Sequence, residues 1–261
     1  MWFFEPKINA RSGVLPYFSG FTTEYKAVLA EGVAQGYTLP SAGQQVKQNI
    51  LLNTLISSGV WAKLDTLFVL ANDGGASFAC INWKNPTGTK ATLVNSPTFT
   101  SNAGFTGNGT SSYIDTNYNP SGSLNYKLND ASRYIYVKTD VFNKLLDGVT
   151  TNGANAMTSL PSVFSKINQG GNNLSTSLDF SGVGMMSIHR NNSSTTVTGF
   201  NNTTQTTVLA NSTSFSNQNQ LILRSFGSYG TQQVSFYAMG ASMVSENSAL
   251  VLAFATYINS L

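Results

Sequence analysis

Hydrophobic residues recur at helical spacing in two segments near the N-terminus, residues 22–36 and 40–59. Each segment begins with a candidate N-cap, Thr22 or Ser41, and ends at a glycine. The apolar positions lie three and four residues apart: Tyr25, Val28, Leu29 and Val33, then Val46, Ile50, Leu52, Leu55 and Ile56. This spacing predicts a helical hairpin. About 40 residues are too few to bury a core alone, so we expect the hairpin to pack on the β domain or on a neighbouring copy.

From Trp61 onward the pattern changes to short runs of β-branched and aromatic residues, which are typical of strands. Clusters of Gly, Asn and Ser separate the runs, and residues 104–109 are predicted to form a sharp turn. The predicted strands are residues 66–71, 92–94, 98–100, 113–116, 133–141, 183–190, 195–200, 206–210, 220–226 and 234–241. So many short strands favour an antiparallel β-sandwich over alternating strands and helices.

The two ends of the chain differ from this β region. Ser245 precedes an apolar stripe that runs to Leu261, which predicts a C-terminal helix. Residues 1–21 show neither the helical nor the strand spacing of apolar residues, and they are interpreted as an extended arm. Its aromatic tip, Trp2, Phe3 and Phe4, is costly to leave in water, so it is predicted to dock on a neighbouring subunit. Docking on its own domain is equally open. The predicted organisation is an arm (1–21), a helical hairpin (22–60) and a β domain (61–261).

Composition narrows the class of protein. Only 10% of the 261 residues are charged, whereas about 25% is usual, so the surface must be mostly uncharged and polar. That is typical of extracellular or virion β proteins. The net charge of +3 is spread along the chain, which argues against nucleic-acid binding. No run approaches the roughly 18 apolar residues of a membrane span, and no signal peptide is recognisable, so we expect synthesis in the cytoplasm.

The stretch after the hairpin also carries a resemblance to a known family. The residues that carry it are Trp61 to Asp65, Asn82-Trp83-Lys84, Phe105-Thr106-Gly107 and Tyr113-Ile114. These opening strands and the Gly-rich turn resemble those of concanavalin A-like (laminin-G-like) jelly rolls, and more narrowly those in bacteriophage virion proteins. The resemblance covers residues 21–261 and implies a mainly β, concanavalin A-like antiparallel β-sandwich (jelly roll). It further implies a virion protein assembled in the host cytoplasm, usually a homotrimer in contact with other capsid or tail proteins.

Candidate catalytic groups are sparse. Glycoside hydrolysis needs two carboxylates at one sugar bond, and no two acids lie two residues apart on a predicted strand. A pair from separate strands stays open, but we expect a non-enzymatic protein without a cofactor. His189, the single histidine, is expected on the polar face of a strand, and Cys80, the single cysteine, in the core. Asn72-Asp73-Gly74-Gly75 offers oxygen ligands for calcium, although a plain turn is favoured and no metal is predicted.

Two functions follow from these observations. The first is a structural virion surface protein, a spike, head fibre or decoration subunit that contributes to host attachment. The second is a carbohydrate-binding module of a tail fibre that recognises a receptor, with aromatic side chains stacked on host surface glycan. The candidate platforms are Trp83, Tyr113, Tyr118 and Tyr229, although any one of them taken singly is more often a core residue.

Overall fold

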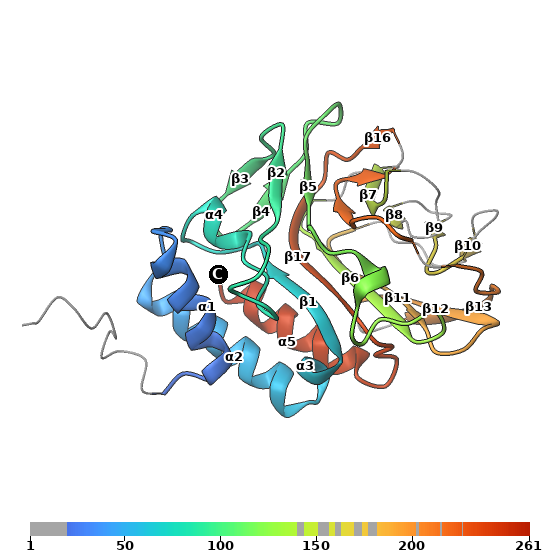
Figure 1. Ribbon diagram of the computed structural model, residues 1–261, viewed down its shortest axis with the longest axis horizontal. Helices are drawn as coiled ribbons and strands as arrows, with labels where there is room; N and C mark the ends of the chain where they lie inside the picture. The colour runs from blue at the N-terminus through green and yellow to red at the C-terminus, as the bar shows by residue number, and fades with distance from the viewer. Residues whose placement is uncertain are drawn as a thin grey trace, which may run out of the picture.

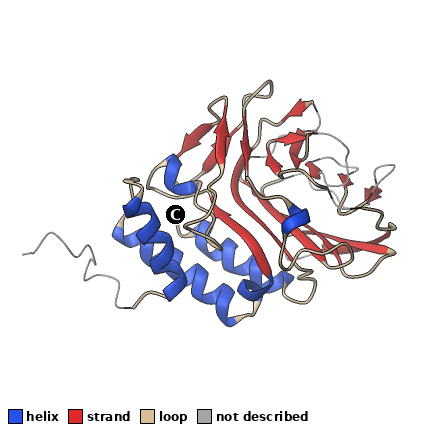
Figure 2. Ribbon diagram, viewed as in Figure 1, coloured by secondary structure: helices blue, strands red, loops and turns tan. Residues whose placement is uncertain are grey.

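The protein consists of a helical layer, a large antiparallel sheet and a smaller sheet (Figure 1). The computed structural model describes residues 20–139, 144–150, 157–159, 163–169, 174–176, 182–201, 204–214, 216–225 and 227–261. In Figure 2 the helices gather on one side of the long central strands. The predicted arm, including Trp2, Phe3 and Phe4, lies outside the described residues apart from its last two positions.

The predicted helices are confirmed with small shifts of their bounds. Helix α1 (Thr23–Ala34) is capped by the Thr22 hydroxyl, and helix α2 (Ala42–Ser57) by the Ser41 hydroxyl. The remaining α-helices are α3 (Val60–Lys63), α4 (Ala76–Ala79) and α5 (Asn247–Asn259). No helix in the described part of the chain has the length and hydrophobicity needed to cross a membrane.

The large sheet is antiparallel throughout and contains eight strands. Strand β17 lies at its centre, pairs with β6 on one side, and pairs with both β1 and β4 on the other. In spatial order the strands are β13 (Thr204–Leu209), β12 (Thr195–Phe200), β11 (Gly184–Arg190), β6 (Ala131–Val137), β17 (Gln233–Gly240), β4 (Gly104–Thr106) and β3 (Thr98–Thr100), with β1 (Leu64–Val69) beside β17.

The smaller sheet packs against the other face of the large one. Its strands, in spatial order, are β2 (Thr92–Val94), β5 (Tyr113–Asp115), β14 (Leu221–Ile222), β7 (Lys144–Gly148) and β8 (Met157–Ser159). Two further strand pairs are β9 (Val163–Ser165) with β10 (Leu174–Thr176), and β15 (Arg224–Ser225) with β16 (Ser228–Tyr229). The 3₁₀ helix η2 (Pro120–Gly122) follows β5.

Strand β1 illustrates how the sequence builds two cores, because successive side chains of a strand point to opposite faces. Leu67 and Val69 enter the core beneath helices α1, α2 and α5. Phe68 and Leu70 enter the core between the two sheets. The hairpin α1–α2 therefore packs on the sheet of its own chain. The protein is mainly β, with a jelly-roll-like antiparallel β-sandwich, an N-terminal helical hairpin and a C-terminal helix, as predicted.

Several local predictions were wrong in informative ways. Residues 104–106 form strand β4 instead of the start of a turn, because Gly104 adopts a φ of 100° that lets the chain pass close to Val234. The predicted strand 220–226 is divided at Leu223, whose φ of 66° breaks the ladder. Strands β7 to β10 have no counterpart among the predicted strands.

The apolar face predicted for α2 is also partly wrong. Val46 and Ile50 are 48% and 55% exposed, while Gln44 and Gln48 are buried. The buried amides find partners, because Nε2 of each donates to the Tyr257 hydroxyl at 3.1 Å. That hydroxyl in turn donates to the Ala71 carbonyl at 2.6 Å. The network joins α2 and α5 to the end of β1, and leaves an apolar strip of α2 facing solvent.

Candidate functional site

Two predicted platform residues meet on the outer face of the small sheet. Tyr113 lies on β5 and Tyr229 on β16, and their ring centroids are 6.2 Å apart at an interplanar angle of 47°. The Arg224 guanidinium lies 4.5 Å from the Tyr113 centroid and 5.3 Å from that of Tyr229. Both tyrosines and the arginine are partly exposed, whereas Ile114 between the outward residues of β5 is fully buried. We refer to Tyr113, Arg224 and Tyr229 as the tyrosine–arginine cluster.

The loop before Tyr113 is fixed by one asparagine. The Asn108 side-chain carbonyl accepts hydrogen bonds from the amides of Thr110, Ser111 and Ser112 at 2.8–2.9 Å. A side chain that replaces three backbone partners gives a compact turn of defined geometry. Tyr113 therefore leaves this loop from a fixed position.

The loop is also bonded to the β15–β16 hairpin. The Gly109 amide donates to the Gly230 carbonyl at 3.2 Å, and the Gly230 amide donates to the Leu223 carbonyl at 2.8 Å. Gly107 passes so close that a Cβ atom there would lie 2.2 Å from the Gly230 oxygen. The cluster is thus held by main-chain contacts between two distant segments, a rigid arrangement suited to binding.

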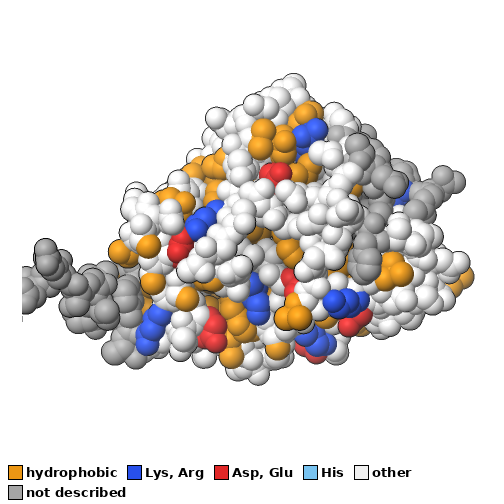
Figure 3. Space-filling model, in the orientation of Figure 1, with side chains coloured by type: hydrophobic (Ala, Val, Ile, Leu, Met, Phe, Trp, Pro, Cys, Tyr) orange, Lys and Arg blue, Asp and Glu red, His pale blue; other side chains and the backbone are white. Residues whose placement is uncertain are grey.

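The cluster carries a positive charge that no acid in the described part of the chain pairs with. Among the described residues Arg224 forms no ion pair, and its buried Nε has no hydrogen-bond partner. The nearest acid along β5, Asp115, accepts from the Asn117 amide at 2.8 Å and from the Asn219 side chain at 3.4 Å. Figure 3 shows hydrophobic side chains around a basic one at the upper end of the visible face, in the region of β2 and β5.

Trp83, a predicted platform, is instead a core residue. It is 1% exposed and packs against Tyr25 with ring centroids 5.5 Å apart. A sugar cannot reach a ring buried this deeply, so Trp83 is corrected from a binding position to a packing position.

Tyr118 is held in a structural contact by its hydroxyl. The hydroxyl bonds to Ser123 and lies 3.3 Å from an Asp65 carboxylate oxygen. Burial, followed by the Asp65 charge, raises the pKa of Tyr118 well above its usual range. Asp65 also accepts from the amides of Asn125 and Tyr126 at 2.9 and 2.7 Å. This tyrosine–carboxylate pair anchors the loop after β5 to β1, and the direction of the pKa shift works against a phenolate nucleophile.

The single histidine lies in the core and not on a polar strand face, which corrects its prediction. His189 is 0% exposed, and its ring meets Tyr134 edge-on at 5.1 Å. Desolvation lowers the pKa of His189 to about 4. Cys80 is buried as predicted, and burial raises the pKa of its thiol to about 12. Both groups are sheltered from substrates.

The turn Asn72-Asp73-Gly74-Gly75, which was weighed as a calcium site and expected to be a plain turn, has a structural role. Asp73 Oδ1 accepts from the Ser41 amide at 2.8 Å and so fixes the start of α2. Gly74 packs against the Thr38 carbonyl, where a Cβ atom would lie at 2.7 Å. Within the described residues, no group of three or more His, Cys, Asp or Glu side chains lies close enough together to hold a metal ion.

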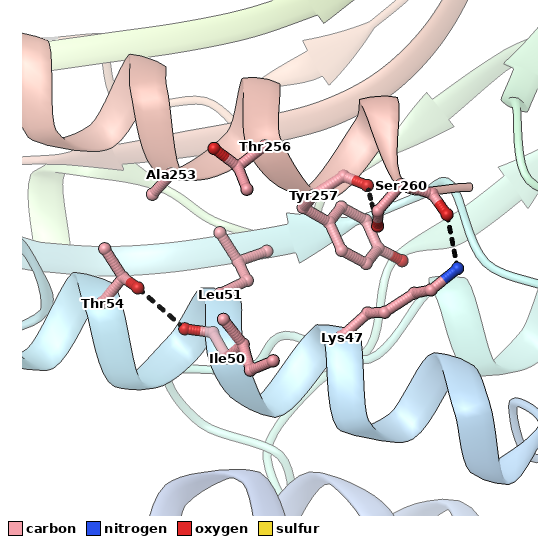
Figure 4. A pocket seen from close by; sticks show the side chains of 8 residues that line it. All are labelled: Lys47, Ile50, Leu51, Thr54, Ala253, Thr256, Tyr257 and Ser260. Carbon is pink, nitrogen blue, oxygen red and sulfur yellow. Dashed lines mark hydrogen bonds between the residues drawn. The ribbon is translucent and has the colours of Figure 1, made fainter.

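A second surface feature is a groove between α2 and α5, which we call the α2–α5 groove (Figure 4). Its volume is about 160 Å³. One end is closed by Lys47, whose Nζ donates to the Ser260 carbonyl at the end of α5. The lining residues are Lys47, Ile50, Leu51, Thr54, Ala253, Thr256, Tyr257 and Ser260.

Comparison with known proteins concerns the fold. No protein-family model and no curated protein sequence matches this chain. A crystallised HCR/D mutant has a TM-score of 0.52 at 6% identity, over 75% of this chain and 52% of that one. Trypanosoma rangeli sialidase has a TM-score of 0.49 at 10% identity, over 83% of this chain and 40% of that one. The botulinum neurotoxin serotype D binding domain has a TM-score of 0.48 at 6% identity, over 75% and 52%.

These similarities have a limited meaning. This chain spans about half or less of each of those proteins. At such identities the likeness concerns the fold alone, and the HCR/D comparison agrees with the jelly-roll-like β-sandwich seen in the sheet order. The activities of these proteins say nothing about the residues of the tyrosine–arginine cluster.

Proposed function

We propose that this chain is a non-enzymatic surface protein of a bacteriophage virion that binds a host surface saccharide at the tyrosine–arginine cluster. The observation that carries the binding role is the Arg224 guanidinium held between the rings of Tyr113 and Tyr229 on the outer face of the small sheet. The virion role is supported by the sequence resemblance and by the low content of charged residues. A spike, head fibre or decoration subunit fits this role, and the alternative is the receptor-recognition module of a tail fibre.

The ligand class follows from the groups that the cluster offers. The guanidinium covers part of each tyrosine ring, so a sugar has less ring face on which to stack. What remains available are hydrogen-bond donors: the guanidinium N–H groups and two phenol hydroxyls. A planar cationic fork pairs best with a carboxylate or another oxyanion. We therefore infer an acidic saccharide as the ligand.

The absence of catalysis is part of the proposal. Asp65 and Tyr118 are an acid and a phenol in hydrogen-bond contact, and both anchor the loop after β5. The pKa of Tyr118 is raised, which disfavours the ionised form that attack on a sugar would need. Asp147, another acid of the β-sandwich, is buried within 2.8 Å of Arg133 Nε.

A glycan array tests the binding role. The purified chain is applied to carboxylated saccharides and to their neutral counterparts, and we expect retention on the carboxylated set. Arg224→Ala should weaken binding at least about tenfold, because a hydrogen bond to a charged group contributes about 1.5–3 kcal/mol. Arg224→Lys should restore it only in part, since an ammonium lacks the planar fork.

Lys84→Ala provides the matched control for the array. Lys84 Nζ lies 4.1 Å from the Trp61 ring centroid, so this variant removes a cation from another aromatic ring. Its binding should equal that of the unmodified chain. Equal retention of Arg224→Ala and the unmodified chain would refute the assigned site, and release of free sugar from an intact saccharide would refute the non-enzymatic role.

Particle imaging tests the virion role separately. We propose that the chain forms a homotrimer in contact with other capsid or tail proteins, with Trp2, Phe3 and Phe4 docked on a partner. Antibodies against the chain should label assembled particles in electron micrographs, and sedimentation should give three times the monomer mass. Labelling confined to host material that lacks particles would exclude this assignment, whatever the array shows.

A further inference from the structure

The α2–α5 groove opens onto an apolar strip that the fold leaves uncovered. Ile50 lines the groove and is 55% exposed, and Val46, one turn earlier on α2, is 48% exposed. On α5, Leu252 is 55% exposed one turn before Thr256, which lines the opposite wall. Residues one turn apart share a helix face, so exposed apolar side chains flank the groove on both helices.

The size and chemistry of the groove fit one aromatic ring. A volume of about 160 Å³ matches an apolar cavity that holds a benzene molecule, which is about 150 Å³. Leu51 and Ala253 supply buried apolar surface between the helices, as Figure 4 shows. Lys47 and Ser260 lie at one end, where the Lys47 ammonium is occupied by the Ser260 carbonyl, and Thr54 and Thr256 are the hydroxyl-bearing residues of the two walls. An unsubstituted phenyl ring therefore suits the space better than a polar side chain.

We propose that the ring of Phe18, from the N-terminal segment of the same chain, occupies the α2–α5 groove. The first argument is where this segment joins the described chain. The Thr22 amide donates to the Asn49 side chain at 2.8 Å, so the segment joins α2 on a face of the helix other than the one that lines the groove, and must cross α2 to reach it. Phe18 precedes Thr22 by four residues, which span up to about 13 Å when extended. That reach is on the order of one helix diameter.

The second argument is the order of residues in the segment. Phe21 packs against Tyr25, with ring centroids 5.4 Å apart, which leaves Tyr17 and Phe18 as the next aromatic residues before α1. Of these two, the phenyl ring brings no hydroxyl into an apolar space. A tethered ring also binds at a high effective concentration, so it outcompetes a second copy. The aromatic tip of the segment, Trp2, Phe3 and Phe4, is more than ten residues closer to the N-terminus than Phe18. It stays available for the partner in the proposed function.

Disulfide trapping tests the placement. In the Phe18→Cys/Thr256→Cys chain, mild oxidation should form an intrachain disulfide at least tenfold faster than in two controls. One control moves the first cysteine to the distal tip, Phe3→Cys/Thr256→Cys. The other control moves the second cysteine to the start of α5, in Phe18→Cys/Ser248→Cys. Cys80 does not interfere, because it is 5% exposed. Equal rates in all three chains, or disulfide-linked dimers whose yield rises with concentration, would overturn the proposal.

A thermal measurement tests the same contact without cysteines. Phe18→Ala should lower Tm by about 3 to 6 °C, as expected when one buried ring is lost from a chain of this size. Phe3→Ala should leave Tm unchanged. Thr256→Phe fills the groove from α5, so in that background Phe18→Ala should have no further effect. An unchanged Tm in Phe18→Ala, or an equal fall in both backgrounds, would show that Phe18 does not bind in the groove.

Discussion

Two aromatic pairs in this protein have nearly the same geometry and different environments. Tyr25 and Trp83 lie 5.5 Å apart at 50°, and Tyr113 and Tyr229 lie 6.2 Å apart at 47°. The first pair is at most 1% exposed and packs beneath the helices, whereas the second is partly exposed under a guanidinium. Pair geometry therefore does not determine the role of an aromatic residue. Burial gives the first pair a packing role. The second pair is exposed and lies under a guanidinium that pairs with no described acid, which supports the proposed binding role.

The largest expected difference between the pairs is in folding stability. Trp83→Ala removes a fully packed ring from the core and should lower the free energy of unfolding by about 3–5 kcal/mol. Tyr113→Ala removes a surface ring with one cation–π contact and should cost about 1 kcal/mol. Urea denaturation followed by circular dichroism measures both. If the two variants lose similar stability, the division between a packing pair and a binding pair is wrong.

A third aromatic pair extends the comparison to pH. His189 lies edge-on to Tyr134 and is fully buried, and desolvation lowers the pKa of His189 to about 4 from 6.5. As the pH falls, the unfolded chain therefore binds the proton first. This contribution to stability is complete above about pH 6.5 and declines as the pH falls toward 4, by up to about 3 kcal/mol.

Denaturation of His189→Gln at several pH values isolates this effect. The variant should show a flatter dependence of unfolding free energy on pH between 6.5 and 4 than the unmodified chain does. Its absolute stability at pH 7 does not matter for the comparison, since the slope is the readout. Parallel slopes for the two chains would mean that His189 keeps its usual pKa in the folded state.

A smaller effect is expected where a buried ring stays and only its hydroxyl is lost. Tyr257→Phe leaves the Ala71 carbonyl without this donor, and the Gln44 and Gln48 amides without this acceptor. Unpaired buried polar groups cost about 1–3 kcal/mol, which denaturant unfolding detects. Tyr229→Phe is the matched control on the surface and should change stability by less than about 0.5 kcal/mol. A Tyr257→Phe chain as stable as this control would show that water or rearrangement satisfies the network.

Much of the fold could be predicted because helix caps and strand–turn alternation depend only on residues that are close in the sequence. The hydroxyls of Thr22 and Ser41 mark helix starts wherever the helix later packs, and the strand runs alternate with turn residues. The buried face of α2 was harder to predict, since the partners of the buried Gln44 side chain, Asp73, Asn102 and Tyr257, come from distant segments. Val46, which the sequence pattern places on the apolar face of α2, is exposed to solvent instead.

The candidate site was predicted only in part for a related reason. Tyr113 and Tyr229 were named singly, but their pairing depends on main-chain contacts between loops far apart in the sequence. Arg224 was not singled out, because a lone arginine in a strand has no local signal of the rings that it will cover. Trp83 has the same local features as a platform residue, and only tertiary burial distinguishes it.

The smallest predicted effect is the loss of affinity when Tyr113 or Tyr229 loses its hydroxyl, and it tests how these residues contact the proposed saccharide. Tyr113→Phe and Tyr229→Phe keep the rings and their contacts with Arg224, so they remove only a phenol hydroxyl. If the hydroxyls donate to an acidic saccharide, each variant should lose about 3- to 10-fold in affinity, because a hydrogen bond contributes about 0.5–1.5 kcal/mol net. Titration calorimetry with the saccharide found on the array measures this. Unchanged affinity in both variants, together with loss of binding in Tyr113→Ala, would mean that the sugar stacks on the rings, and the ligand class would then shift from acidic to neutral saccharides.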